Sequence, residues 1–295
     1  EEKIYNEYME LGLRYPPTFT QVSTTEEAAH VLRSTVIDLV ICMPGNADND
    51  AFDVARDIKG KFPNIHCVVL TPFSHGITKR MQNEDLSIFD YVFCWLGNTN
   101  LILSIIKLIE DKMNLEHDIQ EAGVQMILLV EDSIRFYSSI LPNLYNYILE
   151  QSKNFSKEAL NRHAATLRMR GRPKVVLART YEEAKKLYDK YSNNTLGVIS
   201  DARFPLKSAA RAFGNEVDEA VKPEYGTDTF GREKCPDAGL QLFRYIRKHD
   251  SFVPLILESS ESDNRAKAEA EGFRFVDKNS KKMSVDLRRL MEEHM

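Results

Sequence analysis

Short apolar runs alternate with amphipathic stretches along the first half of the chain. Continuous apolar runs that alternate with helices are typical of a parallel sheet covered on both faces. The apolar spacing predicts helices over 1–12, 24–34, 50–62, a polar stretch ending near Leu86, and 98–118. Predicted strands are FTQVS at 19–23, IDLVICM at 37–43, HCVVLT at 66–71 and FDYVFCW at 89–95.

The second half repeats this pattern. Strands are predicted at 125–132, 174–178, 196–200, 253–259 and 273–278, with helical stretches between them. One helix in each half begins with T-x-E-E-A, at Thr24 and at Thr180, and Thr24 with Glu27 forms a capping-box pattern. We therefore expect an α/β fold of two doubly wound parallel sheets, each with helices on both faces.

Composition narrows the classes of protein. The chain has 295 residues, 43% hydrophobic and 28% charged, with a net charge of -5. This balance favours neither nucleic acid nor an anionic membrane as a partner. No apolar run approaches the roughly 20 residues that span a bilayer. Cys42, Cys67, Cys94 and Cys235 lack C-x-x-C spacing. We expect reduced thiols in a cytoplasmic protein, and, since the chain opens with Glu-Glu, a piece of a longer one.

Polar residues stand where the predicted strands of the second half end. In a parallel sheet such strand ends meet at one edge. Carboxylates that converge there repel each other, which a hard cation such as Mg²⁺ and a lysine would relieve. A carboxylate between two cations is also suited to accept a phosphoryl group. The residues are Glu131, Asp132, Asp201, Ser259 and Lys278.

These residues resemble the receiver domain of two-component response regulators over about 124–295. The motifs are VED at 130–132, D-x-x-x-P from Asp201 to Pro205, Gly239-Leu240, Ser259 five residues after Pro254, Phe275 and Lys278. The resemblance implies a flavodoxin-like fold. The segment with its two insertions is also similar to receivers that precede phosphoenolpyruvate-utilising, ATP-binding domains in some large bacterial proteins.

The resemblance implies a role for each residue. Asp132 and Asp201 would bind Mg²⁺ with the main-chain carbonyl of Arg203, and Glu131 would act through water. Asp201 would take a phosphoryl group from a histidine kinase or phosphotransfer protein, and Lys278 with Ser259 would hold it. Movement of Ser259 would then let Phe275 rotate inward, which would reshape a surface for a downstream effector. Such a domain is no enzyme beyond its own phosphorylation and dephosphorylation. The departures are Glu258, Ser260 and Asn279.

The first copy, 1–118, lacks the phosphoacceptor. Aligned with the second, it has Met43 for Asp201, Thr71 for the switch hydroxyl, Tyr91 for the aromatic and Cys94 for the lysine. Residues 1–12 match the first helix of the unit, so we expect its first strand to lie upstream of this sequence or the first sheet to be incomplete. We predict a degenerate receiver for docking or homodimerisation, joined to 124–295 by a helix at 99–123.

Two insertions distinguish the second copy, at about 151–172 and 206–236. The first is basic, and its RGRP at 170–173 matches the core of the AT-hook, a minor-groove motif. A helical extension with a solvated basic face is the simpler interpretation, and a docking surface for an acidic partner is a third. The second insertion follows Asp201 directly, so it could cover the site, lie on the surface or form a dimer contact.

Four functions compete. The leading one is two-component signalling by Mg²⁺-dependent phosphorylation of Asp201. A phosphate-independent pseudo-receiver scaffold is the alternative, and Mg²⁺ binding without covalent phosphate would indicate it. A small-molecule enzyme of flavodoxin-like fold is the third, although the sequence has no glycine-rich phosphate loop. DNA binding is the least supported, because no helix-turn-helix segment follows either copy.

Overall fold

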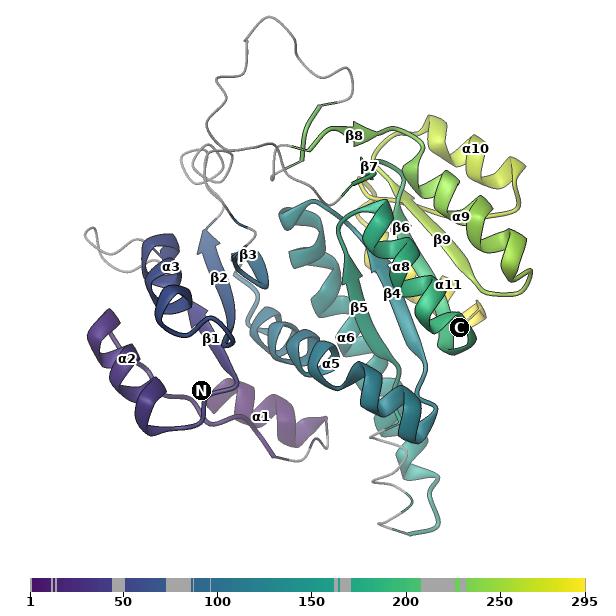
Figure 1. Ribbon diagram of the computed structural model, residues 1–295. Coiled ribbons are helices and arrows are strands. Elements are labelled where there is room, and N and C mark those ends of the chain that lie inside the picture. Colours follow the sequence, from purple (N-terminus) through teal and green to yellow (C-terminus); the bar gives the residue numbers. More distant parts are fainter. Residues whose placement is uncertain are drawn as a thin grey trace, which may run out of the picture. The chain divides into compact units, whose positions relative to one another are not determined.

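Two compact units make up the protein in the computed structural model (Figure 1). The structure describes residues 2–11, 13, 15–43, 51–72, 86, 88–95, 97–161, 164, 171–207, 226–228 and 232–294. Unit 1 comprises Glu1–Ile109 and Ile134–Pro142, and unit 2 comprises Glu110–Ser133 and Asn143–Met295. Helices α5 (Asn100–Ala122) and α6 (Ile134–Lys157) are thus each divided between the units. The division falls within these helices; the prediction was one domain over 1–118, a helical linker over 99–123 and the other domain over 124–295.

Unit 1 contains a three-stranded parallel sheet in the order β1-β2-β3. The helices predicted over 1–12, 24–34 and 50–62 are present. The stretch predicted as helical before Leu86 lies largely outside the described residues. The elements are α1 (Glu2–Glu10), α2 (Thr25–Ser34), β1 (Leu39–Cys42), α3 (Ala51–Lys61), β2 (His66–Pro72) and β3 (Tyr91–Trp95).

The strand predicted at 19–23 is wrong, because these residues form no strand. In a doubly wound sheet of order 2-1-3-4-5, the second strand pairs only with the first. The described part of unit 1 has no strand before β1, and its three strands take the places of the third, fourth and fifth. Residues 19–23 therefore have no strand to pair with, and an unpaired strand leaves its backbone groups without partners.

Aromatic side chains fill the core of unit 1. Tyr8 of α1 is fully buried, and Lys107 Nζ of α5 lies 4.6 Å from the centre of its ring. On α6, Tyr137 donates a hydrogen bond from its hydroxyl to the carbonyl of Val92, and its ring meets Phe93 edge-on at 5.4 Å. Edge-to-face pairs of this kind add to the free energy of apolar burial.

Unit 2 is a complete doubly wound domain. Its sheet has the order β10-β9-β6-β4-β5 with all neighbours parallel, which in chain order is the 2-1-3-4-5 arrangement of flavodoxin-like folds. The predicted fold class is therefore confirmed. The strands are β4 (Met126–Val130), β5 (Lys174–Ala178), β6 (Thr195–Asp201), β9 (Leu255–Ser259) and β10 (Arg274–Asp277), and a short hairpin pairs β7 (Phe204–Pro205) with β8 (Lys234–Cys235).

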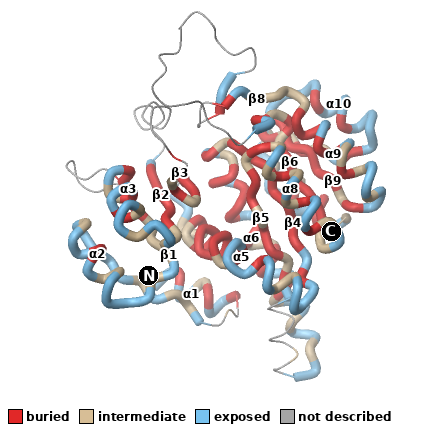
Figure 2. The backbone as a smooth tube through the Cα atoms, viewed as in Figure 1, coloured by how far each residue is buried: buried red, intermediate tan, exposed pale blue. Residues whose placement is uncertain are grey.

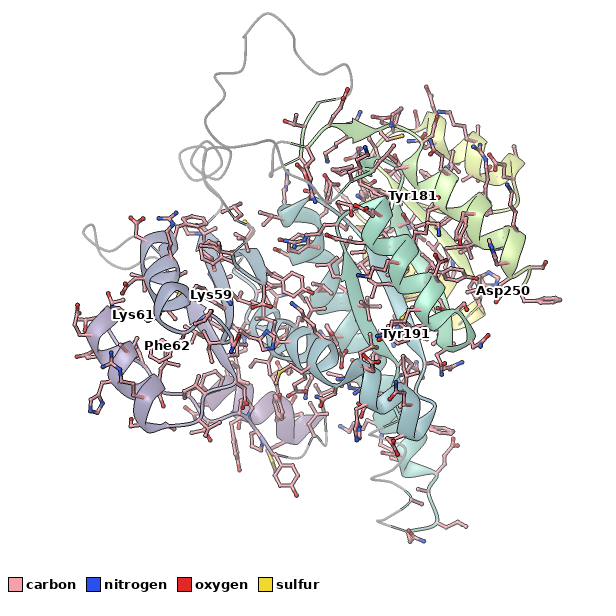
Figure 3. All side chains as sticks on the ribbon, viewed as in Figure 1. Lys59, Lys61, Phe62, Tyr181, Tyr191 and Asp250 are labelled. Atoms are coloured by element: carbon pink, nitrogen blue, oxygen red, sulfur yellow. The ribbon has the colours of Figure 1, made fainter. Side chains whose placement is uncertain are left out.

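Helices cover this sheet, and buried residues run along its strands (Figure 2). Tyr245 on α9 donates to Asp189 on α8 at 2.7 Å, so these two helices are neighbours. The pair Arg288–Glu150, at 3.3 Å, links α11 to α6. The helices are α8 (Tyr181–Tyr191, with both ends labelled in Figure 3), the 3-10 turn η1 (Ser192–Asn194), α9 (Ala238–His249), α10 (Asp263–Ala270) and α11 (Met283–His294).

The repeated T-x-E-E-A motif forms the same helix start in both units. Thr24 Oγ1 accepts a hydrogen bond from the Glu27 amide at 3.2 Å, and Thr180 Oγ1 accepts one from the Glu183 amide at the same distance. Each glutamate reaches back to the amide before the threonine, at 2.8 Å in both cases. The predicted capping at Thr24 is thus confirmed, and it recurs at Thr180.

None of the described helices combines the length and the apolar character that a membrane crossing requires.

Candidate functional site

Three carboxylates gather at the carboxyl edge of the unit 2 sheet. Glu131 and Asp132 follow β4, and Asp201 ends β6. One oxygen from each of the three lies within 4.8 Å of the others. Strands β4 and β6 are adjacent but far apart in sequence, so they flank the point where the strand order reverses. Ligands bind at this point in open α/β sheets.

Backbone contacts hold Asp201 in place. The Ala202 amide donates to Asp201 Oδ1 at 2.8 Å. Helix α9 packs against this loop, and the Gly239 amide donates to the Ala202 carbonyl at 3.0 Å. A Cβ at Gly239 would lie 2.3 Å from the Asp201 carbonyl oxygen, closer than such atoms can approach. The glycine in the predicted Gly239-Leu240 motif therefore allows α9 to approach the aspartate.

Lys278 connects two of the carboxylates. Its Nζ lies 3.0 Å from Asp201 Oδ1 and pairs with Glu131 Oε2, and its side chain is 2% exposed. Burial alone would lower the pKa of Lys278, but Glu131, Asp201 and Glu258 outweigh it and raise the pKa above its usual range. Lys278 is thus a buried ammonium in a site of negative charge.

Glu131 and Asp132, the two carboxylates after β4, differ in their hydrogen bonding. Glu131 is satisfied within the protein, since its Oε1 accepts the Ser133 amide at 3.0 Å and its Oε2 pairs with Lys278. Asp132 is also fully buried, but its Oδ1 has no hydrogen-bond partner among the described residues. Burial raises the pKa of Asp132 to about 6, against the lowering effect of Lys234. An unsatisfied, buried carboxylate oxygen beside two other carboxylates suits a hard divalent cation.

Two charged residues at the site were not predicted as members of it. Glu258 on β9 is fully buried, and no described residue hydrogen-bonds to either carboxylate oxygen. Burial raises its pKa to about 7. Its position in an apolar strand was the available signal. Lys234, on β8, lies with its Nζ 2.5 Å from Asp132 Oδ2. Nothing in the sequence of the second insertion distinguishes this lysine from its neighbours.

The predicted switch residues are at the adjoining strands. The Ser259 hydroxyl accepts hydrogen bonds from the Glu261 amide at 3.1 Å and from Asn264 Nδ2 at 2.9 Å, which leaves its own proton to donate. Phe275 is half-buried, and the Arg265 guanidinium lies 4.7 Å from its ring centre. The Arg203 side chain points to Glu261, at 2.9 Å.

The sheet register identifies the corresponding positions in unit 1. Cys42 pairs with Val69, which places Met43 level with Leu70, and Asp201 pairs with Glu258. Thr71 therefore corresponds to Ser259, as we predicted. The register differs by one residue on the next strand: Thr71 pairs with Cys94, and Ser259 pairs with Asp277. Trp95, rather than Cys94, is level with Lys278, and Val92, rather than Tyr91, is level with Phe275.

Met43 is exposed, while Thr71, Tyr91 and Cys94 are buried. Burial raises the pKa of the Cys94 thiol, so this side chain is neutral. Whichever residue is placed in the lysine position, unit 1 therefore has no ammonium there.

The interpretation of the first insertion as a solvated basic face is wrong for Arg172, at its end, and for Lys174, which follows it. Arg172 of the RGRP match is buried and bonds both oxygens of the fully buried Asp111, at 2.7 and 3.1 Å. Lys174 is buried as well and pairs with Asp118 at 2.7 Å. These side chains attach the end of the insertion to α5. The Arg172 guanidinium is thus buried and bonded to Asp111, so it is not available for an AT-hook contact with DNA.

No protein-family model matches the chain, and no curated protein matches it. Among solved structures, it is similar to the crystal structure of a response regulator receiver domain protein from Clostridium thermocellum, with 16% identity and a TM-score of 0.33. The likeness covers 58% of this chain and 94% of that one. It is too weak to support an assignment, and the fold is assigned from the strand order of the chain itself.

Proposed function

We propose that unit 2 is a receiver that accepts a phosphoryl group on Asp201 in two-component signal transduction. The observation that carries the proposal is the cluster of Glu131, Asp132 and Asp201 within 4.8 Å, with Lys278 Nζ 3.0 Å from the Asp201 carboxylate. The resemblance of these residues to receiver motifs supports the same function. Unit 1 would be a partner without phosphorylation, used for docking or dimerisation.

Asp132 and Asp201 would hold Mg²⁺, with the Arg203 carbonyl as a further ligand and Glu131 acting through water. When bound, the cation would balance the charge of the incoming phosphoryl group. No described residue hydrogen-bonds to Asp201 Oδ2, since the Ala202 amide and Lys278 both contact Oδ1. Oδ2 would attack phosphorus in line, forming an O–P bond as the P–N bond of a phosphohistidine breaks and the imidazole leaves with its electron pair.

Lys278 and the Ser259 hydroxyl would then hold the phosphoryl oxygens. Lys278 supplies fixed positive charge in a buried place, where its effect is larger than in water. Movement of Ser259 toward the phosphoryl group would give Phe275 room to turn inward, which would change the surface near α10 and β10. A kinase or phosphotransfer protein would supply the phosphoryl group, and an effector would bind the changed surface.

Intact-mass spectrometry after incubation with acetyl phosphate and Mg²⁺ tests this function. We expect one phosphoryl adduct that is absent without Mg²⁺ and absent in Asp201→Asn. Asp250→Asn is the matched control, because Asp250 (labelled in Figure 3) follows α9, its Oδ1 accepts the Phe252 amide at 2.7 Å, and its substitution should leave the adduct unchanged.

A pseudo-receiver scaffold is the second candidate, and one contact favours it. Lys234 already neutralises Asp132 at 2.5 Å. If this ion pair were permanent, the acidic site would be closed to Mg²⁺ and Asp201 would never be phosphorylated. Absence of the adduct, beside a receiver that is phosphorylated under the same conditions, would establish the scaffold function instead.

A further inference from the structure

A small β-ladder from the second insertion lies beside the acidic cluster. We call residues 226–228 and 232–235 the insertion hairpin. Its β8 pairs with β7, which begins three residues after Asp201. The Lys234 amide donates to the Gly226 carbonyl at 3.1 Å, and Thr227 bridges to Glu233. The hairpin is therefore connected directly to the loop that carries the proposed phosphoacceptor.

The hairpin satisfies its own buried charges. Arg232 donates from its amide to Asp228 Oδ1 at 2.8 Å and from Nε to Oδ2 at 2.7 Å. The Asp228 amide donates in turn to the Arg232 carbonyl at 2.9 Å. Both residues are buried. Because these bonds stay within the hairpin, it can move as one piece without separating this ion pair.

The β7–β8 ladder joins the hairpin to the rest of unit 2. In the β7–β8 ladder, Phe204 pairs with Cys235 and Pro205 pairs with Lys234. Proline has no amide hydrogen, so it cannot donate to the ladder. The strong link from the hairpin to the site is the ion pair of Lys234 with Asp132, whose carboxylate is fully buried while the lysine side chain is 17% exposed.

We propose that Lys234 is a tethered cation that competes with Mg²⁺ for Asp132, so that metal binding releases the insertion hairpin. The proposal rests on the proposed function, because it assumes that Mg²⁺ binds this carboxylate. Without metal, the Lys234 ammonium compensates a carboxylate that would otherwise be buried and unpaired. A divalent cation on the same carboxylate would lie within a few ångströms of the ammonium, and two cations at that distance repel strongly at a desolvated site.

Two consequences follow from this competition. Lys234 lowers the affinity for Mg²⁺, and by linkage Mg²⁺ weakens the docking of the hairpin to the same degree. Binding of Mg²⁺ would then change the insertion hairpin, at a place separate from the surface near Ser259 and Phe275. The second insertion would serve as an additional output of the domain.

The experiment compares the wild-type chain with Lys234→Met, Lys234→Arg and Lys207→Met. Lys207 is an exposed lysine six residues after Asp201, so its replacement controls for a simple loss of charge near the site. Calorimetric titration with Mg²⁺ should give about tenfold tighter binding for Lys234→Met, a coupling of the usual size between linked sites. Lys234→Arg and Lys207→Met should stay within about twofold of wild type.

Hydrogen exchange distinguishes displacement from electrostatic influence alone. In the wild-type chain, Mg²⁺ should speed exchange at the amides of Phe204 and Cys235, which pair in the β7–β8 ladder that joins the hairpin to the rest of unit 2. In Lys234→Met these amides should exchange faster from the outset and no longer respond to Mg²⁺. Unchanged or greater protection of these amides in the wild-type chain on adding Mg²⁺ would overturn the inference, and so would equal Mg²⁺ affinity of Lys234→Met and wild type.

The failure of this inference can be told apart from failure of the proposed function. If Mg²⁺ binds and Asp201 is phosphorylated while the ladder amides do not respond, only the competition is wrong. If Mg²⁺ binds neither wild type nor Lys234→Met and no phosphoryl adduct forms, both are wrong. The wild-type exchange measurement needs no substitution, so the test does not depend on the folding of a variant.

Discussion

The two units share a succession of strands and helices, but the side chains where their strands end are different. Their helices α2 and α8 begin with the same threonine and glutamate hydrogen bonds. They differ at the carboxyl edge of the sheet, where the register aligns Met43 with Asp201, Leu70 with Glu258, Thr71 with Ser259 and Trp95 with Lys278. Each ionisable position of unit 2 is uncharged in unit 1. The fold is thus compatible with either set, and burial of the charged set in unit 2 carries a cost in stability.

A second difference concerns the edge of the sheet. In unit 2, Val198, Ile199 and Ser200 of β6 are buried between neighbouring strands. In unit 1, Leu39, Val40 and Ile41 of β1 are only half-buried. Without a strand beside it, β1 is the edge strand of the described sheet. A strand at the place that β4 has in unit 2 would carry the counterparts of Glu131 and Asp132, so the described sheet of unit 1 has neither the packing of that strand nor these carboxylates.

Lys278→Met should have the largest effect. It leaves Glu131 buried without its cation, and breaking a buried ion pair costs about 3 to 5 kcal/mol of unfolding free energy. Phosphorylation of Asp201 by acetyl phosphate should slow about a hundredfold, as for loss of one fixed electrostatic group. Urea denaturation followed by circular dichroism measures the first effect, and intact-mass time courses measure the second.

Lys281→Met is the control for this substitution, because Lys281 is exposed three residues further on. Fluorescence of the single tryptophan, Trp95, reports on unit 1 separately. An unfolding free energy of Lys278→Met within about 1 kcal/mol of the control would show that the buried pairs contribute little.

Glu258→Gln should stabilise the metal-free protein at alkaline pH. The pKa of Glu258 is raised from 4.5 to about 7, so the folded state keeps this proton at pH values where the unfolded chain has lost it. Below about pH 4.5 both states are protonated and nothing is lost; stability then falls until about pH 7. The variant should therefore match wild type near pH 4 and exceed it by about 3 kcal/mol at pH 8.

The groups that face Glu258 set the conditions for this measurement. Lys278 lowers the pKa of Glu258 and Asp201 raises it. A bound metal ion would add a further charge near Glu258, so the titrations should be made in the presence of a chelator. Glu121→Gln, at an exposed position, is the control for loss of one carboxylate. Parallel stability curves for Glu258→Gln and wild type from pH 4 to pH 8 would contradict the assigned pKa. Leu70, at the matching position of unit 1, gives that unit no comparable dependence.

The matched helix starts offer a smaller and more local comparison. Thr24→Ala and Thr180→Ala each remove one capping hydrogen bond, at a cost of about 1 kcal/mol. We expect faster hydrogen exchange in α2 for the first variant and in α8 for the second. Serine at either position should restore protection, since its hydroxyl can accept the same amide. Equal exchange in Thr180→Ala and wild type would show that packing of α8 makes its cap redundant.

Local and periodic signals predicted most of the fold from the sequence. The capping motifs, the apolar strand runs and the helical spacing of α5 each depend on neighbours in the chain. The strand at 19–23 was predicted wrongly because a strand also needs a partner, and the partner of this one is not among the described strands. The one-residue difference on β3 has a similar cause, since register is set by pairing and packing rather than by the segment alone.

The site was predictable as far as its members lie at strand ends. Glu131, Asp132, Asp201 and Lys278 come together because parallel strands end at one edge. Lys234 could not be predicted in this way, because it reaches Asp132 across an insertion whose path the local sequence does not determine. Arg172 and Lys174 were misinterpreted for the same reason: their partners, Asp111 and Asp118, are about 60 residues away, as the 61-residue separation of Arg172 and Asp111 shows.

Met43→Asp should produce no phosphorylation of unit 1. This is the smallest expected effect, and it tests most directly what distinguishes the two units. A carboxylate at this position lacks the others that a Mg²⁺ site needs, since Glu131, Asp132 and Asp201 form the one group of three candidate ligands among the described residues. Trp95 is level with Lys278 and brings no charge. The Met43→Asp, Asp201→Asn double variant should therefore show no phosphoryl adduct, while Met43→Asp alone should show one. An adduct on the double variant that maps to residue 43 would mean that an aspartate on this fold needs neither the acidic pair nor the lysine.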